Sequence, residues 1–339
     1  MKINIKKAAA AALLVLFAAS GCSATGNEGV GRRTFALGTV CEQKIYDGSE
    51  SAAADLLKEG ENEINRMDAL ISTSRDSSEI NKIAQAAGDS VECDESVVEL
   101  VARAKQLSEQ TEGAFEPTLG ALIAAWDFNG TPRVPSEEEI KTLLKTVDSS
   151  KIKIDEDADT IAVEKGQQID LGGIAKGYIA DVLTELYRKN GVERALINLG
   201  GNIRAIGEFT LGIRDPQGES DDYVCTITLK DSSIVTSGAY IRNFEQDGVV
   251  YHHILDPKTG KPAESDLLSV SIVCTESAVA DAYSTAVYVL GEKEGLALVE
   301  RTEGAECLLV TEDNRVVMSS GFKAQCAPQF ADGTSYTWE

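Results

Sequence analysis

The chain has 339 residues, of which 43% are hydrophobic, and a formal net charge of −23 at neutral pH. This composition allows a large buried core. The excess of 55 acidic over 32 basic residues argues against nucleic acid as a partner, because binding to a phosphate backbone needs clustered positive charge. A small anionic ligand would have to be held by local groups, since the net charge repels it.

The first residues predict a lipid-anchored exported protein. Three lysines precede an apolar run over residues 8–18, and the small residues of ASGC end in Cys22. This pattern is typical of a secretory signal peptide, and the run is short for a transmembrane helix. The cysteine resembles that of a bacterial lipobox. We therefore expect removal of residues 1–21, a lipid on Cys22, a flexible tether over 22–33, and an extracytoplasmic protein on the cell membrane. The alternative is an ordinary signal peptide with an incidental cysteine.

Apolar residues recur at helical spacing in several later segments. The predicted helices cover residues 50–71, 97–107, about 136–147, about 173–189 and about 277–290. Ser136, followed three residues later by Glu139, matches a capping box at the start of the third. Gly191 is placed to end the fourth.

Other segments alternate or run apolar at the length of a strand. They are KIKID, TIAVE, RALINLG, FTLGIRD, YVCTITL and LLSVSIV, all between residues 151 and 273. We find no linker or repeat after Gly31. The pattern predicts an α+β fold with a mixed sheet flanked by helices, in one long domain over residues 34–339.

Six cysteines follow Cys22, without a CxxC pair or a second histidine cluster that would indicate zinc. Cys274 and Cys307 lie in apolar runs typical of buried strands. Buried, inert thiols are the default interpretation. Disulfides stay open for an exported protein, and the sequence assigns none.

The two histidines of the chain are adjacent, His252 and His253 in YHHILDPKTG. Histidine is the side chain whose ordinary pKa suits proton transfer near neutral pH, so imidazole chemistry has to come from this segment. The alternative is a polar strand end followed by a turn. Neighbouring strand residues point to opposite faces, so one ring is expected to face the body of the protein and the other a cleft or solvent.

Two helix starts suggest ligand binding. In QIDLGGIAKGYIADVL, Gly172 and Gly173 precede a helix whose free amides favour an anion, and Lys176 lies one turn inside; the alternative is a tight turn. In SAVADAYSTAVYVLG, Asp281 and Thr285 are four residues apart and share a helix face, which suits Mg²⁺ together with phosphate oxygens. The alternative is a solvated first-turn carboxylate and a packed threonine.

Eight motifs in this order resemble those of the ApbE family of bacterial flavin transferases, lipoproteins that attach FMN from FAD to protein threonine or serine. The motifs are FALGTV, ALISTSRDSSEINKI, TEGAFEPTLGALIAAW, DLGGIAKGYIAD, ALINLGGNIRAIG, TSGAY, YHHILDPKTGKPA and ADAYSTAVYVLG. The resemblance covers the chain from about Phe35 to its end. It implies an ApbE-like fold and FAD as a substrate.

The resemblance also implies the site residues. Flavin contacts fall on Ala114, Phe115, Glu116, Asp170 and Lys176, near Ile254, and beside Leu37. Magnesium ligands fall on the carbonyl of Gly173 and the side chains of Asp281 and Thr285, and the catalytic histidine falls on His253. Leu37 replaces the usual methionine, a similar apolar volume. Glu116 replaces the usual aspartate, which puts in doubt any role that needs its carboxylate at a fixed distance. His252 is assigned an orienting or structural role.

These assignments predict magnesium-dependent transfer of FMN from FAD to a threonine or serine hydroxyl of an acceptor protein, with release of AMP. No segment after the lipobox matches the SGAT or TGAT acceptor motif, so we expect the acceptor to be another protein. Two alternatives stay open. One is a magnesium-dependent FAD pyrophosphatase that gives FMN and AMP, and the other is a flavin-binding lipoprotein without catalytic activity.

Overall fold

The computed structural model describes residues 29–219, 221–331 and 335–339. Cys22 and the predicted signal peptide therefore lie outside the described residues. The predicted tether over 22–33 extends too far, because Val30 to Arg33 already pair with residues 42–45 in a sheet. The folded domain begins at least four residues before the predicted boundary at residue 34.

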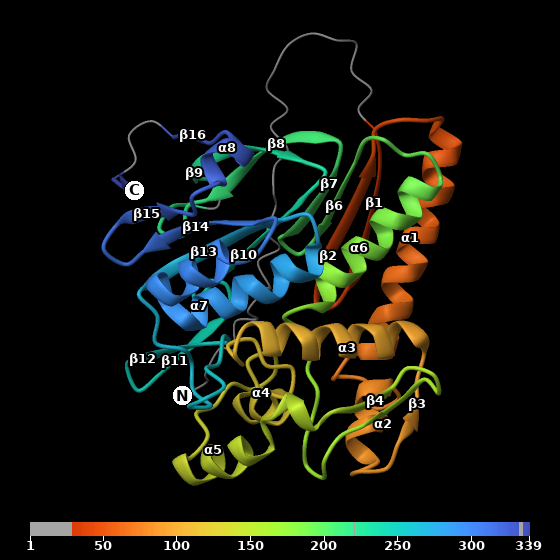
Figure 1. The fold of residues 1–339 in the computed structure, drawn as a ribbon, viewed down its shortest axis with the longest axis vertical. Coiled ribbons are helices and arrows are strands. Elements are labelled where there is room, and N and C mark those ends of the chain that lie inside the picture. The colour runs from red at the N-terminus through yellow and green to blue at the C-terminus, as the bar shows by residue number, and fades with distance from the viewer. Residues whose placement is uncertain (1–28, 220, 332–334) are drawn as a thin grey trace, which may run out of the picture.

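A mixed nine-stranded sheet forms the centre of the molecule (Figure 1). Its strands, in spatial order, are β1 (Val30–Ala36), β2 (Thr39–Ile45), β6 (Ala195–Leu199), β7 (Asn202–Ile206), β10 (Ser233–Gly238), β13 (Leu267–Cys274), β14 (Ala305–Thr311), β15 (Arg315–Met318) and β17 (Thr337–Trp338). Spatial order and chain order coincide. Neighbouring strands are antiparallel except for the parallel pair β15–β17, which confirms the predicted mixed sheet.

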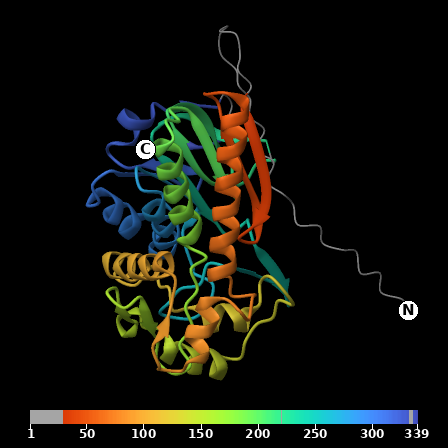
Figure 2. The same ribbon diagram turned by 90° about the vertical axis from the view of Figure 1, so that its right-hand side faces the viewer.

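Helices cover one face of this sheet. They are α1 (Glu50–Ile71), α6 (Ala175–Lys189) and α7 (Ser277–Glu300). Their apolar sides form one large core with alternate residues of the sheet, such as Ile197, Ile272 and Leu309. Figure 2 shows α1 and α6 running along this face, with β1 beside them. The helix predicted over 50–71 is confirmed, and the Ser49 side chain caps it by accepting from the Ala52 amide.

A smaller layer covers the other face. It consists of the three-stranded sheet β8 (Glu208–Arg214), β9 (Tyr223–Lys230) and β16 (Gln329–Phe330), with helix α8 (Phe322–Cys326). Residues that alternate with those of the first face, such as Leu196, Val273 and Leu308, form a second core with it. Both faces of the central sheet are therefore apolar, which explains why its middle strands read as continuous apolar runs.

The remaining elements lie at one end of the sheet (Figure 1). They are α2 (Glu79–Gln85), β3 (Val91–Glu92), α3 (Glu95–Gln110), α4 (Gly120–Trp126), α5 (Glu137–Leu143), the 3₁₀ turns Leu144–Thr146 and Ser149–Lys151, β4 (Lys153–Asp155), β5 (Thr160–Ala162), β11 (Asn243–Gln246) and β12 (Val249–His252). Trp126 of α4 packs against Phe244 and Tyr251 of the β11–β12 hairpin. This third cluster holds the hairpin that leads into the histidine pair. No described helix is long and apolar enough to cross a membrane.

Three helix predictions need correction. Ser136 caps α5 by accepting from the Glu139 amide, but the Glu139 carboxylate pairs with Arg133, so only one half of the predicted capping box is in use. Helix α6 begins at Ala175, two residues after the predicted start. Helix α7 breaks at Gly291, where the predicted helix ended, because this residue has φ 76°, and a second helical segment then continues to Glu300.

All six cysteines among the described residues are free and buried. Burial raises the pKa of each thiol; for Cys307 it rises to about 12. Thiols held in the protonated form are poor nucleophiles, which agrees with the interpretation of inert core residues.

Candidate active site

The site is built where α6 crosses α7 at their N-terminal ends. Gly177 of α6 lies so close to α7 that a Cβ atom there would overlap the carbonyl oxygen of Ser277. Glycine is thus required at this position for the two backbones to meet. Figure 1 shows the two helices side by side above α3.

Each of these two helices caps the N-terminus of the other. The Asp281 carboxylate of α7 accepts from the Gly177 amide through Oδ2 at 3.0 Å. The Asp181 carboxylate of α6 accepts from the amides of Ser277 and Ala278, each at 2.9 Å. Free amides at a helix start need such acceptors. One amide of the predicted anion site is consequently occupied by the protein's own carboxylate.

The glycine pair before α6 carries a compact polar cluster. The Asp170 Oδ1 atom accepts from the Gly172 amide at 2.9 Å, and Lys176 Nζ donates to the Gly172 carbonyl at 2.8 Å. Lys176 Nζ also lies 3.4 Å from Asp281 Oδ1. Burial raises the pKa of Asp170, while the Gly172 amide and the charges of Lys176 and Arg242 act in the opposite direction. Asp170, Gly172 and Lys176 are close in the sequence, whereas the fold brings Asp281 to them from another helix.

The predicted metal ligands also converge. A Cβ atom at Gly173 would lie 3.1 Å from Phe115 Cε2 and 3.6 Å from Thr285 Oγ1. Asp281 is 3% exposed. One buried carboxylate, one hydroxyl and a nearby carbonyl are hard oxygen donors that suit Mg²⁺, which commonly takes one or two carboxylates and completes its shell with phosphate and water. These residues therefore fit the metal that the family resemblance implies.

His253 follows β12 and is half-buried. Its Nδ1 lies 3.2 Å from the Arg242 carbonyl oxygen, which also accepts from the His253 amide. Because a carbonyl oxygen only accepts, Nδ1 carries the ring hydrogen and Nε2 remains an acceptor. Burial lowers the pKa of His253 to about 4, and the positive charges of Arg242 and Lys176 act in the same direction. The ring is therefore neutral at pH 7 and Nε2 can take up a proton.

His252 has a different environment. Its Nδ1 accepts from the Ile254 amide at 3.3 Å, and its Nε2 lies 3.1 Å from the Ala263 carbonyl oxygen. The ring packs edge-on against Tyr288 of α7. Both ring nitrogens are thus used within the segment that follows β12, and the ring contact with Tyr288 places this segment against α7, so His252 has a structural position.

Four further predicted residues make no contact with the cluster around Lys176 that the structure records. Glu116 accepts through Oε1 from Thr118 and through Oε2 from Ser149, so its carboxylate braces two turns and is not presented to the glycine pair. Leu37 lies in the β1–β2 turn with φ 54°, and its amide donates to Asp68. The remaining predicted contacts, Ala114 and Ile254, are buried, with exposures of 5% and 4%.

Arg242 belongs to the site through its carbonyl oxygen, and the sequence carries a signal for its position. Asp247 and Gly248 form the two-residue turn of the β11–β12 hairpin, both with positive φ. An Asp-Gly pair between two strand segments is a strong hairpin signal. Counting outward from that turn pairs residue 242 with His253, as the hydrogen bond between their backbones shows.

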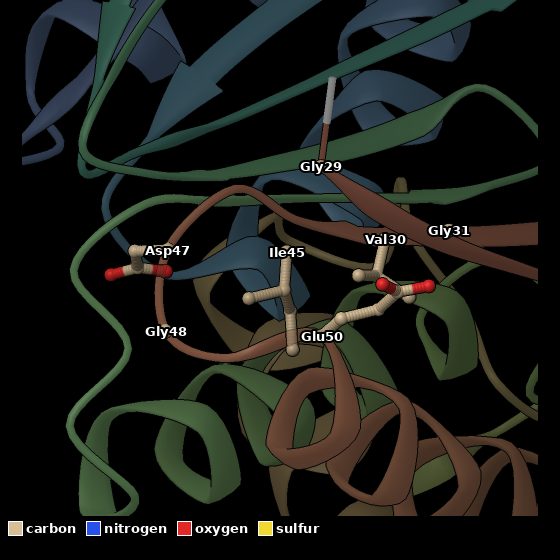
Figure 3. Close-up of a pocket in the computed structure, with 7 residues that line it drawn as sticks. All are labelled: Gly29, Val30, Gly31, Ile45, Asp47, Gly48 and Glu50. Atoms are coloured by element: carbon tan, nitrogen blue, oxygen red, sulfur yellow. The ribbon is translucent and has the colours of Figure 1, made fainter. Parts of the chain in front are cut away.

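The cavity shown in Figure 3 lies elsewhere. It has a volume of about 410 Å³ and lies at the start of β1 and the end of β2. Leu37 is at the opposite end of the β1–β2 hairpin, in its turn. Its lining consists of Gly29, Val30, Gly31, Ile45, Asp47, Gly48 and Glu50. None of these was predicted for the site, and the cavity adds nothing to the cluster around Lys176.

Comparison with known proteins identifies the family and the fold. The ApbE family matches residues 37–309. The FAD:protein FMN transferase of Treponema pallidum is 36% identical over 315 residues, with 86% of each chain covered, and that of Klebsiella pneumoniae is 33% identical, with 86% of this chain and 92% of the relative covered. The crystal structure of the ApbE protein from Thermotoga maritima superposes with a TM-score of 0.81 at 35% identity and covers 88% of this chain and 99% of its own. The flavin transferase ApbE of Vibrio cholerae has a TM-score of 0.78 at 27% identity, with 88% and 99% covered. The fold is that of the ApbE flavin transferases, and the chain belongs to the ApbE family.

Proposed function

We propose that this chain is an FAD:protein FMN transferase that moves FMN from FAD to a threonine or serine hydroxyl of an acceptor protein and releases AMP. Its relatives in Treponema pallidum and Klebsiella pneumoniae are named FAD:protein FMN transferase, which supports the coarser part of this proposal. The observation that carries the proposal is the contact of His253 Nδ1 with the Arg242 carbonyl oxygen, which leaves Nε2 as a proton acceptor within electrostatic range of Lys176.

In this reaction the acceptor oxygen forms a bond to the phosphorus of the FMN half. The bond from that phosphorus to the bridging oxygen breaks, and AMP leaves with the electron pair. His253 Nε2 takes the proton of the hydroxyl, which is a weak nucleophile without a base. The Arg242 carbonyl holds the ring in the required tautomer. Neighbouring Lys176 supplies a positive charge for the phosphates.

Asp281, Thr285 and the Gly173 carbonyl are the residues that would hold Mg²⁺. When bound there, the ion supplies charge neutralisation to the pyrophosphate and the leaving phosphate. Asp281 is fixed for this role because Oδ2 is held by the Gly177 amide while Oδ1 is directed to the Lys176 side.

The test measures two products in one reaction. Full-length protein in detergent is incubated with FAD, Mg²⁺ and a soluble test protein that carries a TGAT segment. A transferase gives covalent flavin on the acceptor and AMP in equal amounts. AMP without acceptor labelling would identify the pyrophosphatase alternative. If neither product forms, the protein would be a flavin-binding protein without catalytic activity.

The pH dependence gives a further prediction. Transfer needs His253 without a proton on Nε2, and burial lowers its pKa to about 4. The value of kcat/KM should therefore rise with pH through about 4 and stay level between about pH 5 and 8, since it reports on the free enzyme. A break near the ordinary histidine value of about 6.5 would contradict the buried, Arg242-bound state of the ring.

We also propose that the protein is anchored outside the cytoplasm by a lipid on Cys22, which lies outside the described residues. The ASGC sequence and the preceding apolar run support this proposal. Cys22→Ser should move the protein from the membrane fraction to the soluble fraction after a salt wash, with flavin transfer by the released protein unchanged. Retention of the variant on membranes would count against this anchor.

A further inference from the structure

Lys176 lies against the carboxylate that the proposed metal ion needs. Its Nζ is 3.4 Å from Asp281 Oδ1 and 2.8 Å from the Gly172 carbonyl oxygen. The Asp281 side chain is 5% exposed, and that of Lys176 is 21% exposed. A buried carboxylate needs a positive partner, and here the lysine is that partner.

The carboxylate of Asp281 cannot rotate to present its other oxygen, Oδ2, to a cation. Oδ2 accepts from the Gly177 amide at 3.0 Å. Gly177 in turn is held against Ser277 by the close helix crossing, so the amide cannot follow a rotated carboxylate. A cation that binds Asp281 has to use Oδ1, the oxygen beside the ammonium group.

Mg²⁺ binds carboxylate oxygen at about 2.0–2.1 Å, and a second positive charge next to the same buried oxygen repels it strongly. We propose that Lys176 is a resident counter-cation of Asp281, which must leave this carboxylate before a divalent cation binds, and that the pyrophosphate of the dinucleotide draws it away. This inference rests on the proposed function for the identity of that ligand. Metal and dinucleotide then bind cooperatively: the metal binds weakly alone and tightly once the phosphates hold the lysine.

The experiment measures Mg²⁺ affinity by calorimetry on full-length protein in detergent, without FAD and without acceptor. Lys176→Gln should bind Mg²⁺ at least about tenfold more tightly than the unmodified protein, within the usual range of such couplings. Lys176→Arg keeps the positive charge and should bind as weakly as the unmodified protein. Lys189→Gln removes a charge from the other end of α6, where the side chain is 77% exposed, and should change nothing.

Thermal unfolding provides a second measurement. Without its counter-cation, Asp281 is a buried unpaired charge, so Lys176→Gln should melt at a lower temperature than the unmodified protein. Mg²⁺ should raise the melting temperature of this variant by more than it raises that of the unmodified protein. Adding Asp281→Asn to Lys176→Gln should abolish the gain in Mg²⁺ affinity.

Equal or weaker Mg²⁺ binding by Lys176→Gln, with no larger thermal response, would overturn the inference. Because no turnover is measured, this result is separable from failure of the proposed function. A chain that transfers FMN normally but shows unchanged Mg²⁺ affinity in Lys176→Gln would refute only the role of the lysine.

Discussion

His253→Ala should lower the transfer of FMN to a threonine-bearing acceptor by about 10²–10⁴-fold, the usual effect of removing a general base. The loss should fall on kcat, because in the proposed mechanism Nε2 acts on the proton of the acceptor hydroxyl. Lys176 and the proposed magnesium ligands, which hold the dinucleotide, are unchanged in this variant. Covalent flavin on the acceptor, measured in single turnover with saturating FAD, gives the rate. FAD affinity, measured separately by fluorescence quenching, should change little.

The neighbouring histidine is the matched control. His252→Gln keeps an amide group that can donate to the Ala263 carbonyl, so the segment after β12 should stay close to its position. We expect transfer within about tenfold of the unmodified protein and a lower melting temperature, because the Ile254 amide and the Tyr288 ring lose their partner. If His253→Ala flavinylates the acceptor at the normal rate, the role assigned to this ring is wrong.

Asp281→Asn should reduce turnover by at least about a hundredfold, comparable to the loss of a preorganised electrostatic group in other active sites. The amide oxygen can still accept from Gly177, so the junction of α6 and α7 should persist while the negative charge is lost. EDTA should reduce the unmodified protein to a similar level, and Thr285→Val should have an effect in the same direction. Turnover that is insensitive to EDTA would remove the metal from the mechanism.

Asp181 is the matched control for Asp281, because both carboxylates accept from backbone amides where α6 and α7 meet. Its carboxylate accepts from the backbone amides of Ser277 and Ala278, and burial raises its pKa to about 6. Asp181→Asn leaves one of these amides without an acceptor, which costs about 1–3 kcal/mol of folding free energy. Its turnover should remain sensitive to EDTA and near normal well below the melting temperature. A hundredfold loss in this variant would show that distortion of the helix junction explains the Asp281 result.

Local signals predicted the long helices. The apolar spacing of residues 50–71 and the glycine at 191 each correspond to a feature of the structure, because both act within a few residues. The first two strands were not predicted. β1 carries Arg32 and Arg33 and lies at the edge of the sheet, so it lacks the apolar pattern of a buried strand. Because this strand lacks the apolar pattern, the flexible tether predicted over residues 22–33 includes its first residues.

The site could be predicted by residue type more readily than by contact. Asp281 and Thr285 share a helix face whatever the rest of the fold does. The contact of Asp281 with Gly177 spans 104 positions in the chain and depends on the angle at which two helices cross. The position of Glu116 depends on hydroxyl groups from two other segments, so its role as a brace could not be derived from the local motif.

The coincidence of spatial and chain order in the central sheet bears on how the protein can fold as it emerges from the ribosome. Each new strand joins the edge formed by its predecessor in the sheet, so a nascent chain can extend the sheet without separating a pair already made. Helix α7 comes after β13 and carries both Asp281 and Thr285. With these two residues as the proposed magnesium ligands, a nascent chain can assemble most of its scaffold before it can act on a dinucleotide, and it becomes competent only when its last third has been delivered.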